Sequence, residues 1–141
     1  MAVPECLFCS AVAGSLSVEV VYSSPAVFAF LDHRPVFKGH VLVVPRAHVV
    51  TLGDLPSADL EPYFADVQRL AVAVEAGLGA GGTFVALNNK VSQSVPHLHT
   101  HVVPRTKGDG LRGFFWPRTK YASDEEAAAV AGAIRAALDG N

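Results

Sequence analysis

The sequence predicts an α+β fold in which a largely antiparallel, five-stranded sheet carries two main helices. Five short runs are rich in β-branched or aliphatic residues, and several of them are joined by turn residues. Two longer stretches repeat apolar residues at helical spacing, and the two kinds of segment follow one another in mixed order. Because the chain has 141 residues and half of them are apolar, we expect a single domain spanning 1–141 with its own core.

The first half of the chain is predicted to form a short helix and three strands. Residues 8–14 can form the helix, with a glycine closing it. Residues 18–22 and 27–31 are strand-like runs separated by the turn residues 23–25. Residues 41–44 form a continuous aliphatic run, which is typical of a strand buried on both faces.

The longest helix is predicted between Ser57 and Gly79. Ser57 or Asp59 can cap its start, Pro62 is expected in its first turn, and Gly77 and Gly79 end it. Apolar side chains recur at steps of three and four residues and should form one buried stripe. These residues are Leu60, Tyr63, Phe64, Val67, Leu70, Ala71 and Val74.

A strand, a polar loop, a histidine-rich strand and a last helix are expected to follow. The strand covers 83–87 and the loop covers 88–94. The last helix opens with Ser123 and Glu126 at the spacing of a capping box. The apolar residues that this helix is expected to bury are Val130, Ile134 and Leu138.

Three of the six histidines alternate at His97, His99 and His101. In a strand, a period of two places them on one face, and Pro96 and Pro104 are expected to bound that strand. The opposite face would carry Leu98, Thr100 and Val102. At a rise of about 3.3 Å per residue, His97 and His101 are about 13 Å apart, so one tetrahedral zinc cannot hold both. A strand face that only contacts solvent does not explain three alternating histidines, so the pattern indicates a functional role.

The two cysteines, Cys6 and Cys9, form a C-x-x-C pair near the start of the chain. No signal peptide is visible and no apolar run approaches the ~20 residues of a membrane span, so a soluble cytoplasmic protein is expected. A disulfide is disfavoured in that compartment, which leaves half a metal site or a redox couple. We favour the metal site because no strand precedes the pair.

Several ordered motifs resemble the histidine triad (HIT) family and together span most of the chain. They are CLFC at 6–9, FAFLD at 28–32, RPV at 34–36, GHVLVVPRAH at 39–48, QSV at 93–95, HLHTHVV at 97–103, PR at 104–105 and KGDG at 107–110. The match is nearest to bacterial zinc-containing HIT hydrolases. The RPV and PR motifs are also similar to those of Fhit-like diadenosine-polyphosphate hydrolases. Thr100 departs from the family's apolar position but suits a half-buried strand.

The resemblance implies a HIT fold with sheets paired in a homodimer, and a nucleotide hydrolase or transferase. Such an enzyme cleaves dinucleoside polyphosphates or nucleoside phosphoramidates, with adenosine-type substrates expected here. By resemblance, His99 attacks the α-phosphorus and forms a covalent nucleotidyl-histidine that water opens. His101 would contact the α-phosphate or the leaving group and share protons. His40 would orient the triad from behind, although a structural polar contact is an alternative role.

The same resemblance assigns the substrate contacts. Gln93 and Ser94 would donate to the phosphate, and Asn88 would mark the edge of the pocket. Asp32 would hold the ribose hydroxyls, unless it only caps the turn before Pro35. The loop from Asn88 to Gln93 is shorter than in relatives and has a serine at 92 where glycine is usual, which leaves the contacts of its asparagines open.

Cys6 and Cys9 need two further ligands for a closed zinc site, and the resemblance supplies His48 and His97. Such a Cys2His2 site would be structural. Two alternatives are reduced cysteines in the core, and a catalytic zinc on His97 and His99 that would leave the cysteines unexplained.

Beyond the triad, residues 105–141 are expected to form a C-terminal extension of the same domain that carries a basic and aromatic segment and the last helix. In that segment, residues 105–121 combine five basic side chains with four aromatic ones. This segment can bind single-stranded nucleic acid, or pack across a dimer and contact the leaving group. We favour the second because the whole chain has a net charge of −2. An alternative for the whole protein is a zinc-stapled nucleotide-binding or scaffolding protein whose turnover is incidental. An aligned nucleophile favours the enzyme.

Overall fold

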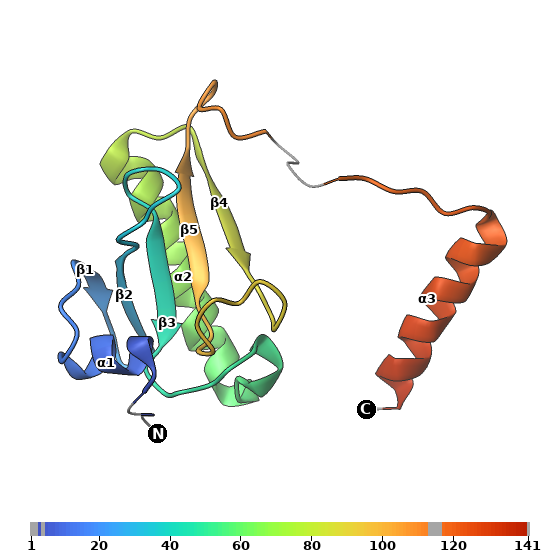
Figure 1. Ribbon diagram of the computed structural model, residues 1–141, viewed down its shortest axis with the longest axis horizontal. Coiled ribbons are helices and arrows are strands. Elements are labelled where there is room, and N and C mark those ends of the chain that lie inside the picture. The colour runs from blue at the N-terminus through green and yellow to red at the C-terminus, as the bar shows by residue number, and fades with distance from the viewer. Residues whose placement is uncertain (1–2, 4, 113–116, 141) are drawn as a thin grey trace. The chain divides into compact units, whose positions relative to one another are not determined.

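The computed structural model describes residues 3, 5–112 and 117–140, which form two compact units. The first unit spans Met1–Asp109 and the second Gly110–Asn141, and each is described by itself. The elements of the first unit are α1 (Leu7–Ala13), β1 (Val20–Ser23), β2 (Val27–Leu31), β3 (Val41–Pro45), a 3-10 turn (Leu52–Asp54), α2 (Ser57–Leu78), β4 (Gly82–Leu87) and β5 (Thr100–Arg105) (Figure 1). The second unit contains α3 (Asp124–Asp139). Within the described residues, no helix is both long enough and apolar enough to cross a membrane.

The five strands form one sheet in the order β1-β2-β3-β5-β4, with every neighbouring pair antiparallel. The predicted α+β class and antiparallel five-stranded sheet are therefore confirmed. The central strands β2 and β3 are buried almost throughout, because helices cover both of their faces. β1 and β4 are the two edges of the sheet.

The two faces of the sheet have separate cores. The helix α2 lies behind the sheet in Figure 1 and packs Tyr63, Val67 and Leu70 against Val27, Val43 and other residues of the strands. On the other face lies α1, whose buried residues pack against Phe30, Leu42 and Val44. The cavity described below opens on the α1 face.

The short helix α1 forms where the sequence predicts it, and its N-cap residue is Cys6. The Sγ atom of Cys6 accepts from the backbone N–H of Cys9 at 3.4 Å. Gly14 ends the helix in the left-handed conformation with a φ of 84°.

Three details of α2 differ from the prediction. The N-cap is Pro56, so Ser57 and Asp59 lie inside the helix instead of capping it. Pro62 is therefore in the second turn, where the Ala58 carbonyl lacks its helical partner; Ala58 is exposed, so water can satisfy that carbonyl. The buried stripe is also narrower than expected, because Leu60 and Phe64 are 39% and 38% exposed.

The histidine strand also begins and ends later than predicted. β5 starts at Thr100 rather than His97, and it continues through Pro104 to Arg105. Its pairing with β3 stops at Val102, so at Pro104 only β4 is a neighbour and no second ladder needs the missing N–H. The alternation of faces is nevertheless confirmed, since Leu98 and Val102 lie in the α2 core while His97 and His99 contact Phe8 on the α1 face.

In the second unit, α3 has the predicted capping serine, and Ser123 Oγ accepts from the Glu126 N–H at 3.1 Å. Within its own unit, α3 leaves Val130, Ile134 and Leu138, which the sequence predicts to be buried, 40%, 60% and 69% exposed, since it is the one helix or strand among the described residues of that unit.

Candidate functional site

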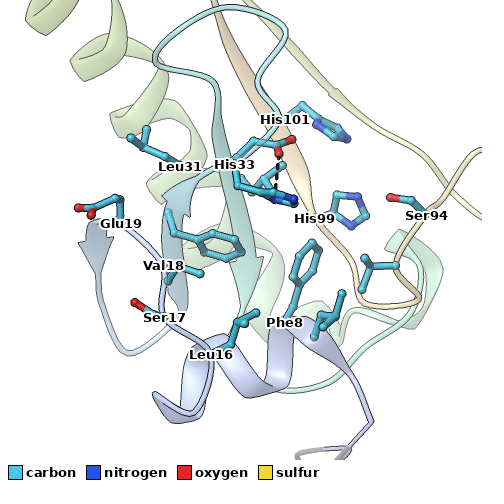
Figure 2. Close-up of a pocket in the computed structure, with 15 residues that line it drawn as sticks. Phe8, Leu16, Ser17, Val18, Glu19, Leu31, His33, Ser94, His99 and His101 are labelled. Carbon is cyan, nitrogen blue, oxygen red and sulfur yellow. Dashed lines mark ion pairs between the residues drawn. The ribbon is translucent and has the colours of Figure 1, made fainter.

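A cavity of about 750 Å³ opens on the α1 face of the sheet. Most of its wall is apolar and comes from α1, the segment that follows it, and strands β2 and β3. The polar groups that line it include Asp32. Figure 2 shows three others, His99, His101 and Ser94. An apolar pocket with a few converging polar groups is typical of a small-molecule site.

His99 is held with one ring nitrogen engaged and the other available. Its Nδ1 lies 2.7 Å from the carbonyl oxygen of His97, and a carbonyl can only accept, so Nδ1 carries the proton. In the neutral ring Nε2 is then unprotonated, which is the form that can attack an electrophile. The side chain is 3% exposed, and Figure 2 shows the Ser94 hydroxyl directed toward its ring.

The hydrogen bond from His40 fixes the tautomer of His101. The backbone N–H of Val36 donates to His40 Nδ1 at 3.1 Å, which assigns the proton of a neutral His40 ring to Nε2. That N–H donates to His101 Nδ1 at 2.9 Å and leaves His101 with its own proton on Nε2. The sequence suggested an orienting role for His40, and the structure places its ring 5.1 Å, centroid to centroid, from that of His101.

Burial favours the neutral form of the His101 and His40 rings. It lowers the pKa of His101 to about 4, with further lowering by the charges of His99 and His40 and an opposing contribution from Asp32. Burial also lowers the pKa of His40, again against the pull of Asp32. At neutral pH His101 is therefore a hydrogen-bond donor without a positive charge.

Asp32 caps a turn and also lines the cavity. Its Oδ1 accepts from the backbone N–H of Arg34 at 2.9 Å, which caps the turn. The carboxylate also lines the cavity, with Oδ2 3.8 Å from His40 Nδ1. One side chain can therefore stabilise the turn and offer an acceptor to a ligand.

Ser94 lines the cavity, whereas Asn88 and Gln93 are not among its lining residues. The Gln93 amide is used within the protein: Nε2 donates to the Val50 carbonyl at 2.6 Å, and Oε1 accepts from the Lys90 N–H at 2.9 Å. Asn88 Nδ2 donates to the Ser92 carbonyl at 3.3 Å. Ser92 has a φ of 62°, the conformation that would favour the glycine expected at this position.

Cys6, Cys9, His48 and His97 converge beside the cavity, with their ligand atoms all within 4.8 Å of one another. His97 Nδ1 lies 3.4 Å from Cys6 Sγ and 3.6 Å from Cys9 Sγ, and His48 Nδ1 lies 3.3 Å from Cys9 Sγ. A tetrahedral zinc with ordinary bond lengths separates sulfur and nitrogen ligands by about 3.6 Å.

The protonation chemistry of the cluster also fits a metal. His97 Nε2 donates to the Pro45 carbonyl at 2.9 Å, which leaves Nδ1 unprotonated and facing the sulfurs. The backbone N–H groups of Val3 and Cys9 point at the two Sγ atoms, each at 3.4 Å. Burial by itself raises the pKa of the Cys9 thiol, so a cation is what would keep it a thiolate. The residues present therefore fit a zinc ion.

Part of the cavity wall was not identified from the sequence. Phe8 lies between the two cysteines, and its ring packs edge-on to the His99 ring at a centroid distance of 5.0 Å (Figure 2). Leu16, Val18 and Val95 complete the apolar wall, and His33 stands at its rim with a 90% exposed side chain. The only available signal was that Phe8 sits inside the C-x-x-C motif. The aromatic residues of the basic segment at 114–116 lie outside the described residues.

The family model of the HIT domain matches residues 14–108 of the sequence, and the chain therefore belongs to the HIT family. An uncharacterised HIT-like protein of Methanocaldococcus jannaschii is 38% identical over 74% of this chain and 82% of its own length. The Schizosaccharomyces pombe bis(5'-nucleosyl)-tetraphosphatase (asymmetrical) is 33% identical over 64% of this chain, and about half of its length is matched. The Saccharomyces cerevisiae bis(5'-adenosyl)-triphosphatase is 37% identical over 63% of this chain and 45% of its own.

Solved structures share the fold. A Streptococcus mutans protein superposes on this chain with a TM-score of 0.87 and is 30% identical in sequence. The superposition covers 97% of this chain and 87% of the Streptococcus mutans chain. A zinc-bound histidine triad protein of Mycobacterium smegmatis has a TM-score of 0.73 at 35% identity and covers 97% of both chains.

Proposed function

We propose that this HIT-family protein is a nucleotide hydrolase or transferase. Its substrates would be dinucleoside polyphosphates or nucleoside phosphoramidates of the adenosine type, cleaved at the α-phosphorus through a covalent nucleotidyl-histidine. The observation that carries the proposal is the hydrogen bond from His99 Nδ1 to the His97 carbonyl, which leaves a nucleophilic Nε2 on a ring that lines the cavity. The two yeast relatives, named as dinucleoside polyphosphate hydrolases, support the substrate class.

In the first step, the Nε2 lone pair of His99 attacks the α-phosphorus, and the bond to the leaving group breaks with its electron pair. A polyphosphate leaving group departs as an anion and needs no proton. The amine of a phosphoramidate leaves with a proton taken from solvent, and the water of the second step returns one. His101 donates its Nε2 proton in a hydrogen bond to a phosphoryl oxygen, where negative charge is concentrated. In the second step water attacks phosphorus, the P–N bond breaks, and the released proton leaves with solvent, so His99 is neutral again.

The remaining contacts follow the cavity. Asp32 would accept from the ribose hydroxyls, and Ser94 would donate to the phosphate beside His99. The apolar wall of Phe8, Leu16 and Val18 would take the base. Gln93 and Asn88 would need to exchange their internal hydrogen bonds before they could contact a phosphate.

The test is an intact-mass measurement after mixing with diadenosine tetraphosphate or an adenosine phosphoramidate. We expect an adenylyl adduct on the wild type and none on His99→Asn, with turnover reduced by about 10⁴-fold or more. If both adduct and turnover are absent from the wild type on both substrates, the enzyme hypothesis fails. If AMP nevertheless binds, that result would favour the alternative, a zinc-stapled nucleotide-binding protein.

We also propose that Cys6, Cys9, His48 and His97 hold one structural zinc ion. Four protein ligands close the tetrahedron, so the metal would cross-link the N-terminal segment to the sheet and would activate no water. In this proposal the metal would lie beside the reacting histidines and would take no part in the reaction.

A homodimer is a further part of the proposal. β4 is at one end of the strand order of the sheet, and its Val85 is 44% exposed. A second copy that pairs with this edge would cover it. Light scattering coupled to size exclusion should give twice the mass of the 14.8 kDa chain, and a monomer would contradict the pairing.

A further inference from the structure

His97 belongs to two features at once. Through Nδ1 it joins the Cys2His2 cluster, 3.4 Å from Cys6 Sγ. Through its backbone carbonyl it accepts the 2.7 Å hydrogen bond that fixes the tautomer of His99. Its side chain is 0% exposed, and Nε2 is bonded to the Pro45 carbonyl, so the ring and its peptide have little room to move independently.

Phe8 provides a second link between the cluster and the cavity. It lies between Cys6 and Cys9, and its ring packs edge-on against His97 at 6.0 Å and His99 at 5.0 Å. The helix that carries it, α1, has seven residues, too few to be stable by its own hydrogen bonds. The position of this wall of the cavity therefore depends on what holds the two cysteines.

His48 occupies the far end of the cluster. Its Nδ1 lies 3.3 Å from Cys9 Sγ, and its ring packs edge-on to that of His97 at 5.0 Å. It is not among the residues that line the cavity. Substitution at His48 can thus empty the metal site without removing any group that faces a ligand.

We propose that the cluster, once closed by zinc, makes Cys6, Cys9, His48 and His97 positioning residues for the nucleophile. Closing the tetrahedron fixes the peptide carbonyl that selects the tautomer of His99, and it holds Phe8 against the ring of His99. Without the metal, four buried side chains lose their common partner, α1 is released, and the imidazole of His99 can exchange tautomers or rotate. The consequence for turnover rests on the proposed function, whereas the positional claim does not.

The experiment compares His48→Ala with His48→Cys in the full chain. His48→Cys keeps four ligands, as Cys3His, and serves as the conservative rescue. Three quantities are measured: zinc per chain, the tautomer of His99 from long-range proton–nitrogen NMR, and AMP affinity by calorimetry. In the wild type and in His48→Cys we expect one zinc and a single Nδ1–H tautomer. In His48→Ala we expect no zinc, a mixed or shifted His99 signal, and AMP affinity lower by about tenfold.

Val67→Ala is the matched control for stability. Val67 is buried in the α2 core on the opposite face of the sheet, and this substitution lowers stability without touching the cluster. The His99 signal and AMP affinity should stay unchanged there. Cd²⁺-loaded wild type tests the same link without a substitution, because the longer metal–sulfur bonds should shift the ring nitrogens of His99.

The proposal is overturned if zinc-free His48→Ala keeps the His99 tautomer and AMP affinity of the wild type, or if Val67→Ala changes them equally. If His48→Ala does not fold, an unchanged His99 spectrum with Cd²⁺ overturns it. Failure of the enzyme proposal is recognised separately: zinc-loaded wild type would then form no adenylyl adduct, whatever its NMR spectrum shows.

Discussion

The Nε2 atom of His40 lies 2.9 Å from the Nδ1 atom of His101, and this contact orders a chain of hydrogen bonds that begins at the backbone N–H of Val36. A backbone N–H can only donate, so each neutral ring along the chain carries its proton on Nε2. The last N–H, on His101, is thereby available to the cavity.

His40→Ala should therefore lower kcat more than it raises KM. Without a donor at Nδ1, His101 can take the other tautomer and present an acceptor to the phosphate. Loss of a tautomer-fixing partner costs about 10²- to 10⁴-fold in other enzymes. His40→Gln, whose amide can still donate, is the control and should retain more activity. Equal kcat values for the two variants would contradict the role.

Asp32→Asn separates the two roles of Asp32. The asparagine oxygen can still accept from the Arg34 N–H, so we expect unfolding free energy to change by less than about 0.5 kcal/mol. The lost carboxylate should weaken ribonucleotide binding by about 10-fold or more, because hydrogen bonds to charged groups contribute about 1.5–3 kcal/mol. A 2'-deoxy substrate should show a smaller effect. A variant that loses stability and keeps KM would mean that Asp32 only caps the turn.

Tyr63→Phe should destabilise the core by about 1–3 kcal/mol in denaturant unfolding. The buried Tyr63 hydroxyl bonds the Val43 carbonyl at 2.8 Å and Thr100 Oγ1 at 2.7 Å, and the substitution leaves both without that partner. In the double variant with Thr100→Val, the threonine hydroxyl is also gone, so the combined cost should be less than the sum. Strict additivity would show that the two hydroxyls do not interact.

Stability should fall as the pH drops from about 6.5 to about 4. The pKa of His101 is about 4 in the folded chain, below the usual 6.5. Between these values the unfolded state binds more protons than the folded state, so acid favours unfolding. Thermal unfolding across this range should show a smaller pH slope in His101→Asn than in the wild type. An identical slope would mean that His101 does not stay neutral on folding.

The metal itself gives a prediction that is independent of catalysis. Native metal analysis should find one zinc per chain, and Cys6→Ser should lose it, because a serine hydroxyl is a poor replacement for a thiolate. Chelation should lower the melting temperature of the wild type and leave that of Cys6→Ser unchanged. Zinc retained in Cys6→Ser would exclude Cys6 as a ligand.

Sequence periodicity was a sound guide wherever a single element decides the outcome. The alternating histidines lie on the face that the period of two predicts, with Leu98 and Val102 opposite them, because successive side chains of extended backbone must alternate. The closing Gly14 and the capping Ser123 likewise follow from the local backbone. For α3 the pattern specifies an apolar face but not the element that would cover it, and within its own unit that face is exposed.

The sequence by itself therefore determined the strand and helix types, the family motifs and the set of reactive side chains. Only the tertiary structure decided how those side chains are paired. The register Leu42↔His101 brings β3 beside β5 and, with it, His40 to His101, and the turn before β5 points the His97 carbonyl at His99. Gln93 is instead held by the Val50 carbonyl. Such pairings depend on strand register and on backbone groups many residues away, which side-chain patterns along the chain do not encode.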